Sequence, residues 1–308
     1  MADALVHPWH PFKSEEAQAR YLALYDEQAR AWPLASEEAL VSTEDGDTSV
    51  RISGPAGGPP LVLLPASRAS SICWISMIEM LSERFRTYAV DAIYDVGRSV
   101  NRRPIKTVDD AMRWLDNLFD ELGLSSGVNL MGLSLGACTA AEYVLHAPRR
   151  LAKAVWLAPA GVVAPISAGF ILRSLPCMVS PRAFEPFMRW IMSDVASSSG
   201  DARAHYDRAV EDVVLSTQCY KMRPMPGGAP REFRDDEFAT IDTPVLYVVG
   251  ENERVCSNAH KALSRLNAVA PQIRAELVDG CGHDIFWMRP DDVSRHVLNF
   301  LDAGSATT

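Results

Sequence analysis

The stretch Val128-Asn129-Leu130-Met131-Gly132-Leu133-Ser134-Leu135-Gly136 decides how this chain folds. An apolar run leads directly into Gly-Leu-Ser-Leu-Gly, and small, helix-compatible residues follow over Ala137–Leu145. A serine on a sharp turn between a strand and a helix has a strained backbone, and flanking glycines leave the room that such a turn needs. The context predicts that Ser134 is a nucleophile exposed at a helix N-terminus, where free N–H groups favour negative charge. The alternative is a purely structural turn.

Apolar runs and helical patterns alternate on both sides of this stretch, as they do in βαβ units. Two strands are expected to form an antiparallel start to the sheet, because Asp45-Gly46 between them is a hairpin signal. The sequence therefore predicts an α/β fold with a mostly parallel, eight-stranded sheet flanked by helices. The hairpin strands are expected at Ala39–Thr43 and Ser49–Ser53, and the six buried parallel strands at Leu61–Leu64, Thr87–Val90, Val128–Met131, Ala154–Leu157, Val245–Val249 and Ala275–Val278.

The helical patterns divide the chain into three parts. A helix is expected over Ser14–Trp32, with Ser14 as its N-cap, and another over Thr107–Leu122, where Thr107 and Asp110 have capping-box spacing. The stretch Ala160–Thr243 has helical patterns without a strand and is too long for an ordinary connection. We expect an N-terminal helical segment at 1–38, an α/β core at 39–160 and 241–308, and a helical cap at 161–240.

The amino-acid composition limits the classes of binding partner that this chain is expected to have. The 308 residues are 48% hydrophobic with a net charge of −9, and residues 1–60 alone carry −6. A nucleic-acid binder or a protein of anionic membrane surfaces would normally be basic, so both are disfavoured. No run of about 18 apolar residues and no signal peptide is evident, which favours the cytoplasm. We expect reduced cysteines, a small-molecule substrate and a monomer or homodimer.

A serine hydroxyl needs a general base, and histidine has the appropriate pKa near neutrality. Of seven histidines, only His283 follows a predicted strand in a glycine-flanked loop, which places it at the same edge of the sheet as Ser134. The third member, an acid that orients the imidazole, should lie between the two in sequence. Glu253 is favoured because it lies farther into its loop than Glu251; Asp95 is a further alternative.

The chain resembles the α/β-hydrolase superfamily from about Ser14 to Leu301, and more narrowly the bacterial carboxylesterase-type group with an N-terminal helix. The stretches that carry the likeness are Arg20–Asp26, Tyr88–Asp91, Gly132–Gly136 and Gly250–Glu253. Members of that group carry Glu where most α/β-hydrolases have Asp, which supports Glu253. The resemblance implies hydrolysis through an acyl-serine intermediate, with no metal and no organic cofactor.

The resemblance also implies an oxyanion hole made by the backbone N–H groups of Leu135 and Ser67. Removing one such donor typically costs about 2.7–4 kcal/mol of transition-state stabilisation. The chain departs from the family here, because Pro65-Ala66 stands where His-Gly is usual. Proline removes an N–H and alanine disfavours a positive φ, so this loop puts catalytic strength and reaction type in question.

Four residues are expected to line the substrate pocket: Ala66, Arg68, Trp74 and Trp190, with Leu135 as a further wall. Arg68 would pair with an anionic group of the substrate, or else be a solvated surface residue. Thioether and aromatic side chains in the predicted cap suit an adaptable apolar pocket, although for any one of them ordinary core packing between cap helices is the favoured explanation. They are Met178, Met188, Met192, Met222, Met225, Phe170, Phe184, Phe187 and Trp190.

These observations predict a serine hydrolase that cleaves a small to medium, mainly apolar carboxylic ester. Two other classes of function are kept open. One is a lyase, cyclase or acyl-transfer enzyme, since one fold supports many reactions. The other is a ligand-binding protein without turnover.

Overall fold

The computed structural model describes residues 9–221 and 223–303, and within these ranges nine strands form one sheet. The strand order is β1-β2-β4-β3-β6-β7-β8-β9, with β5 paired to β2. The strands are β1 (Ser36–Thr43), β2 (Gly46–Ser53), β3 (Pro60–Leu64), β4 (Arg86–Val90), β5 (Val100–Asn101), β6 (Val128–Leu133), β7 (Leu151–Leu157), β8 (Val245–Gly250) and β9 (Arg274–Val278).

The predicted α/β fold with a mostly parallel sheet is confirmed. The strands β3, β4, β6, β7, β8 and β9 pair in parallel, and β1 and β2 form the expected antiparallel hairpin. The predicted strand number is one too low, because the two-residue β5 pairs with the start of β2. A strand of two residues has no alternation that a sequence pattern could reveal.

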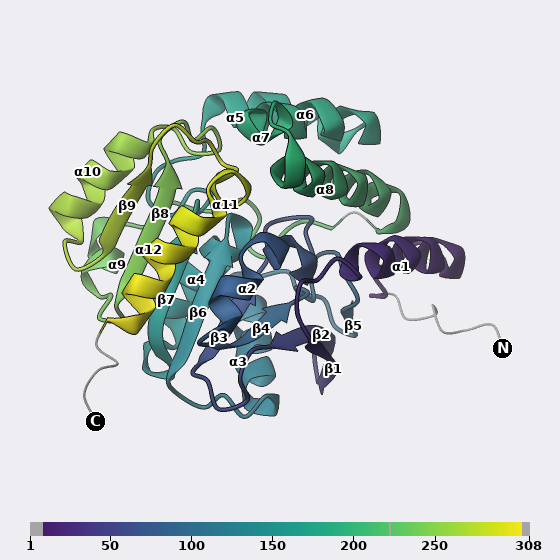
Figure 1. Ribbon diagram of the computed structural model, residues 1–308, viewed down its shortest axis with the longest axis horizontal. Coiled ribbons are helices and arrows are strands. Elements are labelled where there is room, and N and C mark those ends of the chain that lie inside the picture. Colours follow the sequence, from purple (N-terminus) through teal and green to yellow (C-terminus); the bar gives the residue numbers. More distant parts are fainter. Residues whose placement is uncertain (1–8, 222, 304–308) are drawn as a thin grey trace.

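Helices cover both faces of the sheet and one of its ends (Figure 1). They are α1 (Glu15–Ala29), α2 (Ile78–Ser82), α3 (Val108–Glu121), α4 (Leu135–His146), α5 (Ala168–Ser174), α6 (Phe184–Ile191), α7 (Ser193–Ala196), α8 (Gly200–Cys219), α9 (Asp235–Ala239), α10 (Ala259–Val269), α11 (Ile285–Met288) and α12 (Pro290–Asp302). Short 3-10 turns occupy Ser71–Ser76, Pro148–Arg150, Leu175–Met178 and Pro181–Ala183. None of the helices within the described ranges is long and apolar enough to cross a bilayer.

The N-terminal helix α1 begins where its sequence predicts, since the Ser14 hydroxyl accepts a hydrogen bond from the N–H of Ala17. It packs against α8 rather than the sheet, as Figure 1 shows. Tyr21 and Tyr25 are buried, and the Gln28 amide donates to the Arg208 carbonyl at 3.1 Å. Residues 1–8 of the predicted N-terminal segment lie outside the described residues.

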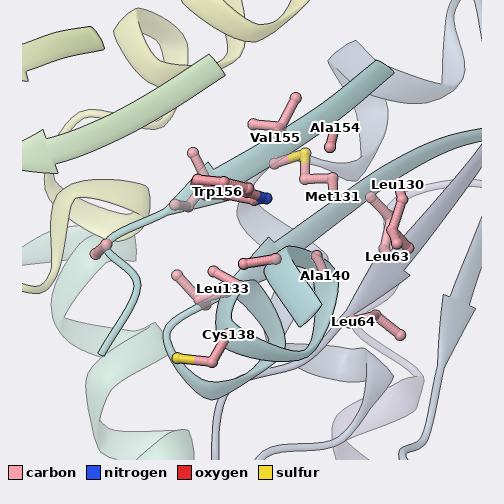
Figure 2. Close-up of a cluster of buried hydrophobic side chains, with 14 of the residues drawn as sticks. Leu63, Leu64, Leu130, Met131, Leu133, Cys138, Ala140, Ala154, Val155 and Trp156 are labelled. Carbon is pink, nitrogen blue, oxygen red and sulfur yellow. The ribbon is translucent and has the colours of Figure 1, made fainter. Parts of the chain in front are cut away.

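The core around the central strands depends on small residues in α4. Ala140 and Cys138 face the inner side chains of β6 and β7, and Figure 2 shows them beside Leu133 and below Trp156. Trp156 is fully buried, so a large side chain fills the space that the small ones leave. This packing holds α4, and with it Ser134, against the end of β6.

Residues 161–240, which lie between β7 and β8, contain α5 to α9, and we call them the helical insertion. Its helices α5 to α8 lie beyond one end of the sheet (Figure 1). Large apolar side chains are exposed mainly on α5 and the turns that follow it: Ile171, Leu172, Leu175, Met178 and Val179. Met222 of the insertion lies outside the described residues.

Candidate active site

Ser134 occupies the sharp turn between β6 and α4. Its backbone has φ 52° and ψ −110°, a conformation that residues other than glycine rarely adopt. Neighbouring glycines make the turn possible: a Cβ on Gly132 would lie 2.1 Å from the Gly136 carbonyl oxygen, and one on Gly136 would lie 2.3 Å from that of Leu64. The turn thus presents the Ser134 hydroxyl at the first turn of α4.

His283 lies in the loop between β9 and α11, and its Nε2 is 3.0 Å from Ser134 Oγ. Its Nδ1 is 2.8 Å from Glu253 Oε2. An ionised carboxylate only accepts hydrogen bonds, so Nδ1 carries the proton and Nε2 offers a lone pair to the serine hydroxyl. This is the tautomer that a general base requires.

The environment of the imidazole favours its charged form. Burial lowers the pKa of His283, but the Glu253 carboxylate, through its charge and its hydrogen bond, outweighs burial and holds that pKa above its ordinary value. The two side chains are only 5% and 1% exposed, so solvent screens the pair little. The site therefore favours the protonated imidazole more than water does.

Glu253 is itself fixed by its loop. Its Oε1 accepts hydrogen bonds from the backbone N–H groups of Arg254 and Val255, both at 2.7 Å, which leaves Oε2 for His283. Glu251, by contrast, is exposed, and it accepts the N–H of Gly280. Asp95 lies on the loop after β4, where it accepts the N–H of Arg68 at 2.9 Å. Of the three acids considered from sequence, only Glu253 contacts His283.

The loop after β3 carries the residues expected to complete an oxyanion hole. Ser67 and Leu135 both line the pocket that holds Ser134, and Leu135 is the first residue of α4, where N–H groups have no acceptor within the helix. From the sequence, a positive φ was expected to be a difficulty at Ala66. In the structure it is Arg68 that has a positive φ, of 55°. Asp95 fixes that conformation by accepting the Arg68 N–H.

A pocket of about 380 Å³ contains Ser134 and His283, and it is within the usual size range of small-molecule sites. Its walls are mostly apolar side chains of the helical insertion, which meet the loops at the carboxyl ends of β3, β6 and β9. The predicted residues Ala66, Arg68 and Leu135 line it. Phe170, Phe184, Phe187, Met188, Met192 and Met225, noted in sequence as candidates, line it too.

Two predicted pocket residues are not in the wall, and these expectations are corrected. Trp74 is fully buried in the core, because the 3-10 turn Ser71–Ser76 directs it away from the pocket. Trp190 lies on α6, whose pocket face carries Phe187 and Ile191. Trp190 therefore points to the neighbouring face, where it stacks on Phe187 at 6.4 Å and supports the wall from behind.

Two hydrogen bonds, not predicted from the sequence, link the loop that holds His283 to the helical insertion. Asp194 accepts the N–H of Gly282 at 2.9 Å, and Asp284 accepts the N–H of Val195 at 2.8 Å. These reciprocal bonds join α7 to both sides of His283. Burial raises the pKa of Asp284. No local pattern marks either aspartate, because their partners are about 90 residues away in sequence.

Nothing in residues 9–221 and 223–303 resembles a metal centre, since no group of three or more His, Cys, Asp or Glu side chains is placed to hold an ion. All six cysteines are free thiols. Separately from these findings, the contacts of His283 with Ser134 and Glu253 have the geometry of a serine, a general base and an orienting carboxylate.

Comparison with known proteins places this geometry in a family. The model of the alpha/beta hydrolase family matches residues 61–296. Carboxylesterase YbfK of Bacillus subtilis is 33% identical over 95% of this chain and 97% of its own length. An uncharacterized carboxylesterase, nap, of the same organism is 32% identical over 92% and 93%.

Two solved structures that this chain matches are also those of carboxylesterases. The crystal structure of carboxylesterase CesB (YbfK) from Bacillus subtilis matches with a TM-score of 0.84 at 32% identity, over 94% of this chain and 99% of that one. Naproxen esterase (carboxylesterase NP) from Bacillus subtilis matches equally well, with a TM-score of 0.84 at 31% identity over 94% and 99%. The chain therefore belongs to the alpha/beta hydrolase family and resembles bacterial carboxylesterases over most of its length.

Proposed function

We propose that this protein is a serine carboxylesterase that hydrolyses small to medium, mainly apolar esters through an acyl-serine intermediate. The observation that carries the proposal is the continuous hydrogen-bond chain from Ser134 through His283 to Glu253, in the wall of an apolar pocket. The likeness to carboxylesterases supports the same bond specificity.

In the first half-reaction, His283 Nε2 takes the hydroxyl proton while Ser134 Oγ attacks the ester carbonyl carbon. The carbonyl oxygen becomes an oxyanion, which the N–H groups of Leu135 and Ser67 receive. Glu253 stabilises the imidazolium through Nδ1. As the tetrahedral intermediate collapses, the imidazolium protonates the leaving alcohol and the acyl group stays on Ser134.

In the second half-reaction, water takes the place of the alcohol. His283 removes a proton from the water, the resulting hydroxide attacks the acyl carbon, and the imidazolium returns the proton to Ser134 Oγ as the carboxylic acid leaves. The helical insertion serves as a cap in this scheme, because its side chains form most of the pocket around the acyl carbon.

The pocket wall sets the preferred substrate. Phe187, Met188 and Ile191 repeat on one face of α6 and offer apolar surface to the acyl chain or an aromatic group. We expect activity to rise with chain length until the pocket of about 380 Å³ is full and then to fall. The cytoplasmic location and the monomer or homodimer inferred from sequence stay predictions.

A panel of p-nitrophenyl esters, thioesters and lactones of graded chain length tests the proposal. Ester cleavage that disappears in Ser134→Ala supports it, while wild-type protein inactive on the whole panel contradicts it. Repeating the reaction with a competing alcohol, and analysing products, separates hydrolysis from acyl transfer: the carboxylic acid should dominate. The alternatives of lyase, cyclase, transferase or pure binding protein have no observation that favours them over hydrolysis.

A further inference from the structure

A second cavity, of about 360 Å³, adjoins the pocket that holds Ser134. Ser67, Arg68 and Phe187 line both spaces, so the two share a wall formed by the loop after β3 and by α6. The remaining walls come from Pro11, from α5, the 3-10 turn Leu175–Met178 and α6, from the loop after β4, and from the segment that follows α8. We call this space the side cavity.

The side cavity carries an excess of positive charge. Its described lining residues include three cations, Arg68, Lys221 and Arg223, and one carboxylate, Asp95. Burial raises the pKa of Asp95 to about 6, so near neutral pH it is ionised and offsets one of the three positive charges. The surplus contrasts with the net charge of −9 on the whole chain. A concave site lined by one sign of charge concentrates ions of the other sign.

Arg223 is held in place by two hydrogen bonds that do not neutralise its charge. Its guanidinium donates to Asn101 Oδ1 at 2.6 Å and to the Trp9 carbonyl oxygen, and both acceptors are neutral. The backbone N–H of Lys221 donates to the Pro11 carbonyl oxygen at 2.8 Å, which fixes the chain while the side chain is exposed. Within residues 9–221 and 223–303, neither cation forms an ion pair with a carboxylate.

Arg68 stands where the two cavities meet. Its guanidinium lies over the ring of Phe184, with Cζ 4.7 Å from the ring centroid, and both residues line both cavities. Stacking on an aromatic face fixes the guanidinium and keeps its charge. The positive surface thus begins beside Ser67, one residue before Arg68, and continues outward to Lys221 and Arg223.

We infer that the side cavity is a subsite for an anionic group, such as a carboxylate, on an ester whose apolar part occupies the pocket beside Ser134. This inference rests on the proposed esterase function. The apolar pocket holds the part next to the scissile bond, and the cations of the side cavity receive the charged end. The preferred substrates are then hemi-esters and other esters that carry one negative charge.

The test compares matched esters in wild type and variants. In one pair the acyl side carries the charge: the mono-p-nitrophenyl ester of hexanedioic acid against p-nitrophenyl hexanoate. In the other pair the alcohol side carries the charge: 4-carboxyphenyl hexanoate is compared with phenyl hexanoate. The readout is the ratio of kcat/KM for the charged ester to that for its neutral partner. Lys221→Glu and Arg223→Met perturb the side cavity, and Arg68 is left intact because its backbone shapes the loop beside Ser134.

Arg182→Glu is the matched control, since Arg182 is exposed on the helical insertion and lines neither cavity. For at least one pair, Lys221→Glu should lower the ratio by about fivefold or more, since it reverses a partly screened charge. Arg223→Met should lower the ratio in the same direction, 0.5 M NaCl should weaken the effect, and Arg182→Glu should leave the ratio unchanged. Thermal midpoints check that the variants fold.

Ratios that are equal in wild type, Lys221→Glu and Arg223→Met for both pairs would overturn the subsite while leaving esterase activity intact. If wild type cleaves no ester of either pair, the proposed function fails instead. The subsite is then decided by calorimetric titration with hexanedioate: binding that Lys221→Glu weakens supports it, and absence of binding refutes it.

Discussion

Replacing Glu253 by glutamine tests the arrangement of the site with almost no change in shape. In the wild type one carboxylate oxygen accepts two backbone N–H groups, from Arg254 and Val255, and the other accepts His283 Nδ1–H. Glutamine keeps one oxygen and gains an NH₂ group. Turning the NH₂ toward the backbone would leave two buried N–H donors unpaired, which costs about 1–3 kcal/mol each. The amide oxygen therefore stays with the backbone and the NH₂ faces His283.

That orientation forces the wrong tautomer on the imidazole. Nδ1 must accept from the new NH₂, so the proton moves to Nε2, which then has no lone pair for Ser134. The same substitution removes the charge that stabilises the imidazolium. In a serine triad an equivalent loss lowers kcat by about 10⁴-fold, and we expect about 10³- to 10⁴-fold here.

The assay is steady-state hydrolysis of a p-nitrophenyl ester by Glu253→Gln, with Glu251→Gln as the matched control. Glu251 lies two residues earlier, is exposed and contacts Gly280 rather than His283. Thermal unfolding should show both variants folded. A Glu253→Gln enzyme within tenfold of wild-type kcat would refute the assigned role, as would an equal loss in Glu251→Gln.

The pH profile adds a second readout with a definite sign. His283 must be neutral to act as base, so kcat/KM rises with pH through its pKa. Because Glu253 raises that pKa, the wild-type rise should be centred above 6.5, the ordinary value. In Glu253→Gln burial, which lowers the pKa of His283, outweighs the remaining charge of Asp284, which raises it. The residual activity should therefore rise at lower pH, and an unshifted or upward-shifted limb contradicts the account.

Three further predictions concern the turn, the fold and the pocket. Gly136→Ala should lose about 1–3 kcal/mol in urea unfolding, as well as activity, because the new Cβ would lie 2.3 Å from the Leu64 carbonyl oxygen. Burial raises the pKa of Asp212 from 3.8 to about 7, so the free energy of unfolding falls as pH rises between these two values, and the full loss is present above about pH 7. Asp212→Asn should raise the thermal midpoint more at about pH 8.5 than at about pH 5.5, and an equal gain would contradict this. Met188→Trp narrows the pocket and should reduce kcat/KM for p-nitrophenyl decanoate about tenfold relative to the acetate.

Features with a local cause could be predicted from the sequence. The turn at Ser134, the capping box of Thr107 and Asp110, and the hairpin with its turn at Glu44-Asp45 each depend on residues within a few positions of one another. Strand periodicity likewise sufficed for the parallel sheet. Chain order and loop position were enough to single out His283 and Glu253, which the structure joins at 2.8 Å.

Features that depend on residues distant in the sequence could not be predicted from it. Trp74 and Trp190 lie in the expected segments, but the packing of the turn and of α6 decides which way each ring faces. The hydrogen bond between Gly282 and Asp194 joins two segments that are about 90 residues apart in sequence. The side cavity likewise combines Arg68 with Arg223, which only the folded chain brings to one wall.

Labelling with a fluorophosphonate probe tests the central claim most directly, because the probe reacts only with a serine that a neighbouring base activates. Intact-mass and peptide mass spectrometry should find one phosphonyl group per chain on Ser134. Ser134→Ala should take up none, and His283→Ala should react far more slowly. Wild-type protein that resists the probe, or labelling that persists in Ser134→Ala, would contradict the assignment of Ser134 as the nucleophile.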